Sequence, residues 1–272
     1  MSNAYKHVSG VVLDWAGTTV DHGSRAPAIV FQKVFSSRGI EITVAQAREP
    51  MGMAKLDHIA TIVAMPDVAA AWTAKFGQRC QPEDIEAMYA EFLPLQKKTL
   101  DQHCRIIEGV PQAVEQLRAR GLKIGSSTGY TRELMEVVTA ATTPQGYVPD
   151  CVLCAEDAPR GRPAPFLLFE AAMRLDIYPM TTIVKVDDTA VGIQAGRNAG
   201  CWTVGVTLTG NCVGLSREEV EALSEPERVA KCEAAEEKLR DAGAHEVIES
   251  VADLPAVVDL FEEKLARGQR PD

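Results

Sequence analysis

The stretch that decides the fold is VVLDWAGTTV, residues 11–20. Its first three residues, with Val8 just upstream, form a short apolar run that predicts a buried strand. The run stops at Asp14, and the Gly-Thr-Thr of residues 17–19 then offers a tight loop and hydroxyls that can bond an anion. A carboxylate at the carboxyl end of a buried strand stands where open α/β sheets bind ligands. Taken alone, Asp14 is better interpreted as an ordinary turn or cap residue, so a functional role for it depends on the other motifs of the chain.

From residue 108 onward, short apolar runs alternate with helical patterns, which predicts a parallel sheet flanked by helices. The expected strands are residues 122–126, 151–154, 182–186 and 201–206, with an edge strand at 245–248. The expected helices are residues 109–120, 131–141, 163–175, 189–198 and 251–265, with two more between 217 and 242.

The block between the first strand and residue 100 has a different character. Its apolar residues keep helical spacing throughout, and Thr43 and the Pro-Glu-Asp of residues 82–84 are helix-start signals. The block therefore predicts a small helical bundle over the active site. We expect an α/β fold with a Rossmann-like parallel sheet core, residues 1–22 and 101–272, and an inserted all-helical cap domain, residues 23–100.

Composition limits the possible partners. The net charge of −10 argues against nucleic acid and anionic membranes, because both need a basic surface. No apolar run approaches the ~20 residues that span a bilayer, and the first ten residues lack signal-peptide features, so we expect a cytoplasmic protein. Seven scattered cysteines predict no disulfide framework. The only CxxC, Cys151 and Cys154, lacks the second ligand pair that a structural zinc site needs.

The adjacent carboxylates Asp187 and Asp188 follow an apolar strand that contains Lys185. Neighbouring carboxylates repel each other, and they persist most readily where a cation neutralises them. An Asp pair can also be a turn or a helix cap. The strand end and the polar residues at the other strand ends favour a metal site, and oxygen ligands beside a phosphate-type substrate favour Mg²⁺.

The motifs DWAGTT, residues 14–19, and MGMAKLDH, residues 51–58, together resemble the phosphonatase family of the haloacid dehalogenase superfamily. The resemblance runs over nearly the whole chain. It implies that Asp14 is the nucleophile that takes up the phosphoryl group. It also implies that Mg²⁺ is bound by Asp14, by Asp188 and by the backbone carbonyl of Ala16, while Asp187 acts through a water.

The same resemblance implies two substrate-binding residues in the core. Thr128, after the second core strand, would hydrogen-bond the phosphoryl group, although it is also a candidate helix N-cap. Arg162, just before Pro163, would hold the phosphoryl oxygens with its planar guanidinium. Relatives carry a cysteine near the position of Ser24, so that contact is altered here.

Ala16 stands where most phosphatases of the superfamily have a second Asp, their general acid and base. Ester hydrolysis expels an alkoxide, and a general acid speeds such a step typically 10²–10⁴-fold. A carbon leaving group needs no such acid if an aldehyde first becomes a protonated imine, which accepts the electron pair as an enamine. That route requires a lysine amine that is neutral when it attacks.

Lys55 is the candidate amine, in the second matching motif at the entrance to a helix. Gly52 would let the backbone approach the substrate closely. His58, three residues beyond Lys55, lies on the same helix face and would shuttle protons during imine formation. Tyr130 and Trp15 are candidates for the wall of the aldehyde pocket, or for ordinary packing. Without the motif, Lys55 would be interpreted as a solvated lysine on the surface.

The resemblance thus implies an enzyme that hydrolyses the P–C bond of a small phosphonate aldehyde, phosphonoacetaldehyde, to acetaldehyde and phosphate, and that forms a homodimer. Two alternatives stay open. A phosphomonoesterase or phosphomutase of the same superfamily is disfavoured by Ala16. A phosphate-binding module without catalysis is disfavoured because every strand end keeps its polar residues.

Overall fold

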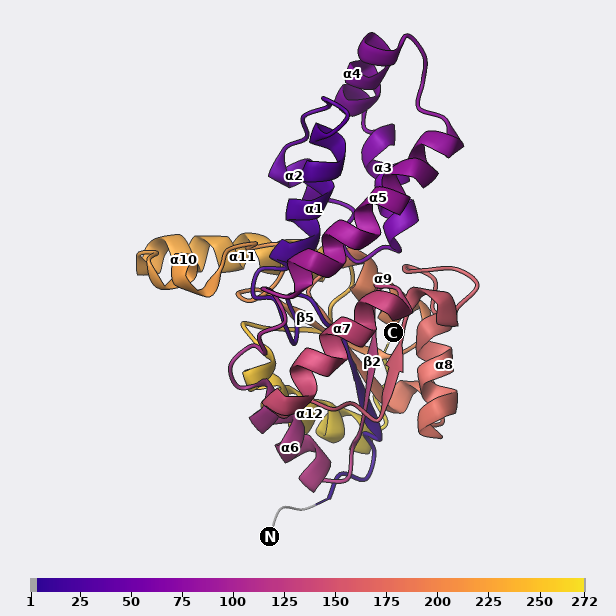
Figure 1. Cartoon of the computed structure of the whole chain (residues 1–272). Helices are drawn as coiled ribbons and strands as arrows, with labels where there is room; N and C mark the ends of the chain where they lie inside the picture. Colours follow the sequence, from indigo (N-terminus) through magenta and orange to yellow (C-terminus); the bar gives the residue numbers. More distant parts are fainter. Residues whose placement is uncertain (1–3, 272) are drawn as a thin grey trace.

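The computed structural model describes residues 4–271. Its centre is a parallel sheet in which the strand order is β3-β2-β1-β4-β5-β6 (Figure 1). This order reverses at β1, which lies between β2 and β4, and such a switch point is where open α/β sheets bind ligands. The strands are β1 (Gly10–Leu13), β2 (Lys123–Ser127), β3 (Cys151–Leu153), β4 (Ile183–Asp187), β5 (Trp202–Val206) and β6 (Glu246–Ile248).

The register brings the strand ends level with one another. Leu13 of β1 lies beside Ser126 of β2 on one side and beside Val186 of β4 on the other. The next residue in each strand therefore reaches the same edge of the sheet. This is how Asp14 and Asp187, which are far apart in sequence, come together.

Alternate residues of β1 point into different apolar clusters, as the period of two in a strand requires. Val11 and Leu13 pack with the face covered by α6 (Val110–Ala119), α7 (Arg132–Thr142) and α12 (Leu254–Ala266). Val12 packs with the face covered by α8 (Phe166–Leu175) and α9 (Ala190–Asn198). Two further helices, α10 (Arg217–Glu221) and α11 (Glu225–Asp241), follow β5, and α11 packs on β5 and β6.

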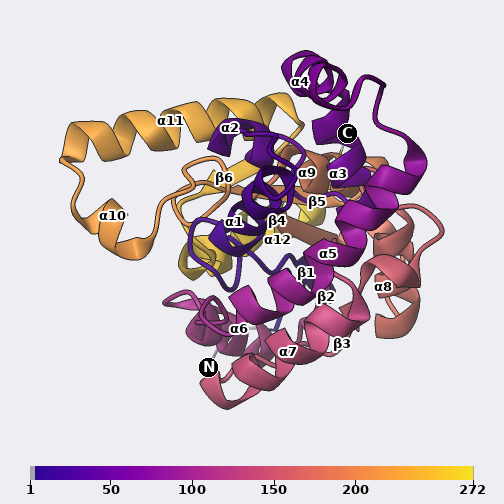
Figure 2. The same ribbon diagram turned by 45° about the horizontal axis from the view of Figure 1, so that its top comes forward.

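Between β1 and α6 the chain forms only helices, which stand over the carboxyl edge of the sheet (Figures 1 and 2). They share an apolar cluster of their own, built around Phe31, Phe35, Ile59, Met88 and Phe92. The helices of this inserted block are α1 (Arg25–Ser36), α2 (Val44–Arg48), α3 (Lys55–Ala64), α4 (Pro66–Phe76) and α5 (Pro82–Leu100). The domain boundaries at residues 22/23 and 100/101 remain a prediction.

The predicted α/β fold with a parallel sheet is confirmed, and the predicted strands lie within about two residues of the observed ones. Two helices start three residues later than expected. The one expected from residue 251 is α12, which begins at Leu254 after a short 3₁₀ helix at Val251–Asp253. The other is α8. It was expected from residue 163, but α8 begins at Phe166, because residues 161–164 form a turn closed by the Ala164 N–H and the Gly161 carbonyl.

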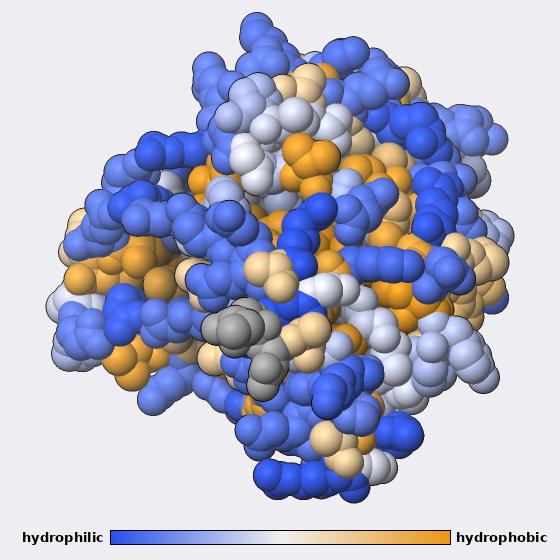
Figure 3. Space-filling model, turned by 90° about the horizontal axis from the view of Figure 1, so that it is seen from below, coloured by the Kyte–Doolittle hydropathy of each residue, from blue (hydrophilic) through white to orange (hydrophobic). Residues whose placement is uncertain are grey.

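All seven cysteines are free thiols. Within residues 4–271 no single helix is long and apolar enough to cross a bilayer. The pair α3 and α4 passes that test only when counted together, across a bend of 81°. Seen from the end opposite the inserted block, the surface is mainly hydrophilic, with separate apolar patches between the hydrophilic residues (Figure 3).

Candidate active site

Three carboxylates meet at the carboxyl edge of the sheet. Asp14 follows β1, Asp187 ends β4 and Asp188 comes next, and each of them is buried. One oxygen from each lies within 4.8 Å of the others. In the described part of the chain this is the only cluster of three or more acidic, histidine or cysteine ligands, so the Cys151–Cys154 pair forms no such cluster.

Two buried cations neutralise part of this negative charge. The Arg162 guanidinium joins two of the carboxylates, since Nη2 lies 2.7 Å from Asp14 Oδ1 and Nη1 lies 3.1 Å from Asp187 Oδ2. Lys185 Nζ lies 2.9 Å from the same Asp187 oxygen. Arg162 also donates to the Ser127 carbonyl at the end of β2. The strand ends are therefore linked by a charged network that spans the switch point.

Asp188 differs from its neighbours because only neutral groups hold it. Thr18 Oγ1 donates to its Oδ1 over 3.1 Å, and the Asn211 backbone N–H donates to its Oδ2 over 2.7 Å. The surroundings leave little room: a Cβ on Gly17 would lie 2.2 Å from Asp188 Oδ2, and one on Gly210 would lie 2.6 Å from Asp188 Cβ. Glycines are thus required around this carboxylate.

The pKa values follow from this pairing. Burial opposes ionisation of Asp187, yet Arg162 and Lys185 together hold its pKa below the usual range. Burial and the negative charges of Asp14 and Asp187 raise the pKa of Asp188 well above its usual range. Burial also raises the pKa of Asp14, and Arg162 only partly opposes that effect.

These residues fit a divalent cation. Three carboxylates face two cations, Arg162 and Lys185, so the cluster lacks positive charge, most of all at Asp188. Carboxylate oxygens are the ligands that hard cations such as Mg²⁺ prefer. Asp14 and Asp188 are the carboxylates left for a metal, because Asp187 already accepts hydrogen bonds from the Thr189 N–H and hydroxyl as well as pairing with both cations.

Lys55 lies in the first turn of α3, in the inserted block, and lines the same small cavity as Asp14. It is only 4% exposed, and among residues 4–271 no carboxylate oxygen lies within ion-pairing distance of its Nζ. The amine instead lies over the rings of Tyr130 and Phe31, at 4.9 Å and 5.7 Å from their centres. Burial lowers the Lys55 pKa to about 8, although Asp14 favours the charged form.

His58 lies one turn beyond Lys55 and is fully buried. Its ring stacks on Phe31 with 3.8 Å between the centres, and Nε2 donates to the Ala47 carbonyl over 2.9 Å. Nδ1 has no hydrogen-bond partner in the described chain, and burial keeps the His58 pKa well below its usual range. The ring is therefore neutral, with a free acceptor at Nδ1, and it does not line the cavity beside Asp14.

A cavity of about 20 Å³ lies between the inserted block and the core. Its lining joins the nucleophile candidate and the lysine to most of the predicted substrate-binding side chains: Asp14, Ala16, Ser24, Pro27, Met51, Gly52, Lys55, Thr128, Gly129, Tyr130, Arg162 and Thr189. Trp15 packs instead edge-on against Tyr147, outside this lining. The space holds about one water molecule.

Thr128 is not the helix cap that was one interpretation of its position. Thr131 caps α7, and its side chain accepts from the Leu134 N–H. Thr128 Oγ1 accepts from the Tyr130 N–H over 3.1 Å, so its hydroxyl proton stays free to donate into the cavity. Tyr130 is buried, and burial raises its pKa well above the usual range.

The two halves of the site touch through glycines. Gly52, with φ of +94°, lies so close to α9 that a Cβ would be 2.4 Å from Thr189 Oγ1. On the core side, a Cβ on Gly129 would lie 2.4 Å from the Met53 carbonyl oxygen. A side chain at either position would push the inserted block away from the core, so the closed arrangement depends on both glycines.

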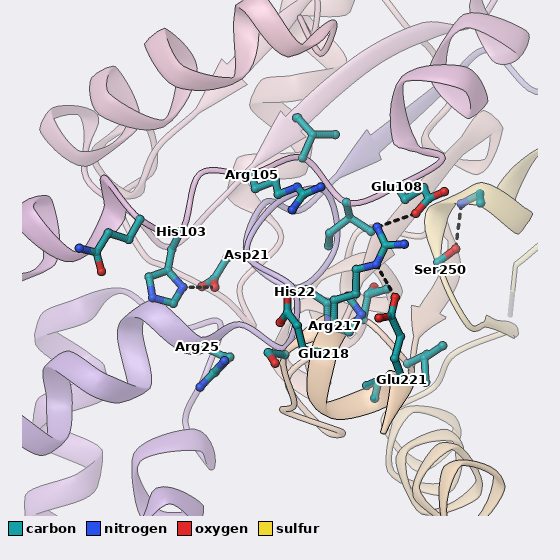
Figure 4. A pocket seen from close by; sticks show the side chains of 18 residues that line it. Asp21, His22, Arg25, His103, Arg105, Glu108, Arg217, Glu218, Glu221 and Ser250 are labelled. Carbon is teal, nitrogen blue, oxygen red and sulfur yellow. Dashed lines mark hydrogen bonds and ion pairs between the residues drawn. The ribbon is translucent and has the colours of Figure 1, made fainter. Parts of the chain in front are cut away.

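A larger cavity of about 530 Å³ lies elsewhere, beside the two connections between the core and the inserted block (Figure 4). Its charged groups are largely paired with one another: Arg217 with Glu108 and Glu221, and His103 with Asp21 (Figure 4). It contains no acid cluster. The smaller cavity is therefore the better candidate for the active site.

Several residues that support the site were missed from the sequence. Asn211 and Gly210 belong to a loop with no recognisable motif, whereas Gly17 and Thr18 lie in the motif of residues 14–19 but were expected to serve an anion rather than Asp188. Lys185 was noted only as a residue inside the strand. The spacing of Lys185 and Asp187 was the one usable signal of their ion pair, because side chains two residues apart leave a strand on the same face.

Known proteins resemble this chain in sequence and in fold. A family model described as haloacid dehalogenase-like hydrolase matches residues 8–200. The phosphonoacetaldehyde hydrolase of Paraburkholderia phytofirmans is 44% identical over 98% of this chain and 100% of its own length. A crystal structure of a phosphonoacetaldehyde hydrolase-like protein from Oleispira antarctica is 42% identical, with a TM-score of 0.96 over 100% of this chain and 98% of that one.

A β-phosphoglucomutase from Clostridium difficile has a TM-score of 0.69 over 96% of this chain and 100% of its own. At 17% identity, this likeness shows a shared fold alone. The family model and the full-length relatives go further, because they match the sequence as well as the fold. The chain is therefore a hydrolase of the haloacid dehalogenase-like family, and within it the chain belongs to the phosphonoacetaldehyde hydrolase family.

Proposed function

We propose that the protein hydrolyses the P–C bond of phosphonoacetaldehyde, giving acetaldehyde and phosphate, as a step in phosphonate degradation. Relatives that carry the name phosphonoacetaldehyde hydrolase align along nearly the whole chain, which supports this substrate. The observation that carries the proposal is the buried amine of Lys55, which shares one small cavity with Asp14 and has a pKa of about 8.

In the proposed first step, the neutral Lys55 amine attacks the aldehyde carbon, and loss of water gives an imine. With a pKa of about 8, about one Lys55 in ten is neutral at pH 7, far more than for an ordinary lysine. Apolar surroundings activate lysines for this chemistry. His58, neutral and with a free Nδ1, is the group on the same helix that would accept and return protons.

In the second step, an Asp14 oxygen attacks phosphorus. The P–C bond breaks, and its electron pair forms a carbon–carbon double bond while the protonated imine becomes a neutral enamine. Protonation of the enamine and hydrolysis of the resulting imine release acetaldehyde and restore Lys55. Water then hydrolyses the aspartyl phosphate, so that one water is consumed in the whole cycle.

The remaining cavity residues have positioning roles. Arg162 and the Thr128 hydroxyl would hold the phosphonate oxygens, and Arg162 keeps the Asp14 carboxylate in place. A bound Mg²⁺, held by Asp14, Asp188 and the Ala16 carbonyl, would neutralise the negative charge between the phosphonate and the nucleophile. Ala16 presents only a methyl group, and the enamine leaving group needs no acid there.

The cavity of about 20 Å³ cannot admit this substrate, so the described arrangement is the closed one. We propose that the cap, residues 23–100, opens for substrate and closes to bring Lys55 over Asp14. Tyr130 and Gly52 would then line the aldehyde side. A homodimer and a cytoplasmic location are further parts of the proposal, and light scattering of the purified protein would test the first.

The test is turnover of phosphonoacetaldehyde by the purified protein with Mg²⁺. Acetaldehyde, measured by coupled reduction, and phosphate should appear in equal amounts, with little release of phosphate from sugar phosphates. Faster hydrolysis of sugar phosphates than of phosphonoacetaldehyde would favour the phosphomonoesterase alternative and overturn the proposal.

A further inference from the structure

Arg48, the last residue of α2, crosses from the inserted block to the core. Its guanidinium donates only to uncharged acceptors: Nη1 reaches the Gly23 carbonyl over 2.7 Å and Asn211 Oδ1 over 3.0 Å, and Nη2 reaches the Gly214 carbonyl over 2.9 Å. Asn211 returns the contact, because its Nδ2 donates to the Arg48 carbonyl over 3.2 Å. Arg48 and Asn211 are thus joined through both side chains and through the backbone carbonyl of each residue.

The same Asn211 touches the acid cluster. Its backbone N–H donates to Asp188 Oδ2 over 2.7 Å, one of only two hydrogen bonds that hold that carboxylate within residues 4–271. A chain of direct contacts therefore runs from Arg48 in the inserted block, through the loop of residues 207–214, to a carboxylate of the candidate metal site.

We propose that Arg48 is a positioning residue: it latches the inserted block onto the core and, through Asn211, holds Asp188 in the geometry that binds metal. The inference rests on the proposed opening of the cap. The planar guanidinium reaches several carbonyls at once, which an ammonium cannot do. Opening the cap removes Arg48 from its acceptors on Asn211 and Gly214 and frees the loop around Asn211, so cap closure and the order of the metal site are coupled.

The first test measures how often Lys55 becomes accessible, without substrate and without metal. Lys55 is buried in the closed arrangement, so an amine-acetylating reagent reaches it only when the cap opens. Arg48→Gln should speed acetylation of the Lys55 peptide, followed by mass spectrometry, by about tenfold, because several hydrogen bonds from a charged group are lost. Arg48→Lys should give an intermediate rate.

Arg38 offers a matched control, because its guanidinium bonds the Val34 carbonyl and Glu91 and so stays within the inserted block. Arg38→Gln should leave the Lys55 acetylation rate at the parent value, and the exposed Lys33 reports reagent strength in every sample. Should Arg48→Gln fail to fold, Asn211→Ala removes the same side-chain contact. A parent rate in folded Arg48→Gln or in folded Asn211→Ala would overturn the latch.

The second test addresses Asp188. Mn²⁺ affinity, measured by calorimetry on protein without substrate, should fall several-fold in Arg48→Gln and stay unchanged in Arg38→Gln. Unchanged Mn²⁺ affinity in Arg48→Gln would overturn the link through Asn211. Neither measurement uses P–C cleavage, so failure here is distinct from failure of the proposed reaction.

Discussion

The candidate active site has a side formed by the edge of the sheet and a side formed by the inserted helices, and the buried charged groups on these two sides have opposite surroundings. On the sheet side, Asp187 is paired with Arg162 and Lys185, and its pKa is held low. On the helical side, Lys55 faces aromatic rings, and burial lowers its pKa to about 8. The difference shows that the effect of burial on a pKa depends on the neighbouring charges. Asp187 keeps its charge because cations pair with it, whereas burial drives Lys55, which faces aromatic rings, toward its neutral form.

The first prediction concerns the loss of the Asp14 carboxylate at the edge of the sheet. Asp14→Asn should lower phosphate release from phosphonoacetaldehyde at least about a thousandfold, because an amide is a poor nucleophile. The substitution also removes one carboxylate from the acid cluster, so weaker metal binding adds to the loss. Asp57→Asn, an exposed residue of the same helix as Lys55, is the control and should keep parent activity. Activity of Asp14→Asn within about tenfold of the parent would remove Asp14 from the nucleophile role.

The second prediction concerns the addition of a negative charge at residue 16, where the protein has an uncharged alanine. Ala16→Asp should lower P–C cleavage about a hundredfold, because a fourth carboxylate repels Asp14 and Asp188 and the leaving group needs no acid. Ala16→Asn adds the same bulk without the charge and should lose less activity. Steady-state rates with phosphonoacetaldehyde measure both. A faster Ala16→Asp enzyme would show that proton supply at residue 16 was limiting.

The third prediction contrasts the two buried lysines by thermal unfolding at pH 7. Lys185→Met should destabilise the protein by about 3 kcal/mol, because it removes one of the two cations that neutralise the buried Asp187. Lys55→Met should stabilise it by about 1 kcal/mol, because the buried amine has no ion-pair partner among residues 4–271. Equal destabilisation by both substitutions would contradict the proposed difference between the two lysines.

The fourth prediction concerns pH. The Lys55 pKa is lowered to about 8, so the neutral amine gains population as pH rises toward 8. The kcat/KM for phosphonoacetaldehyde should therefore rise up to about tenfold per pH unit below 8 and then level off. The folded state releases its Lys55 proton at lower pH than the unfolded chain does, so stability gains from this group as pH rises from about 8 to the unfolded value. A flat rate profile between pH 6.5 and 9 would contradict the role of Lys55.

The parts of the site that were predictable from sequence are the strand ends. Each short apolar run stops at a polar residue, and the parallel register then places those ends at one edge, as it does for Asp14 and Asp187. The placement of Lys55 and His58 on one helix face was also predictable, because residues three apart in a helix lie on the same face. The assigned chemical roles of these residues remain predictions.

The contacts that depend on distant loops could not be predicted. Nothing in the sequence near residue 211 indicates that its backbone N–H holds Asp188, or that Arg48 reaches the same loop from another part of the fold. The stacking of the His58 ring on Phe31, outside the cavity lining, is likewise set by tertiary packing rather than by spacing.

The most direct test of the central claim is chemical trapping of Lys55. Treatment with phosphonoacetaldehyde and borohydride should reduce the imine, inactivate the enzyme irreversibly and add mass to the peptide that carries Lys55. Lys55→Arg should resist this inactivation and show essentially no turnover, because a guanidinium stays protonated and cannot attack a carbonyl. The exposed Lys33→Arg variant, as control, should be trapped and turn over like the parent. Full activity of Lys55→Arg, or label found mainly on other lysines, would contradict the Schiff-base mechanism.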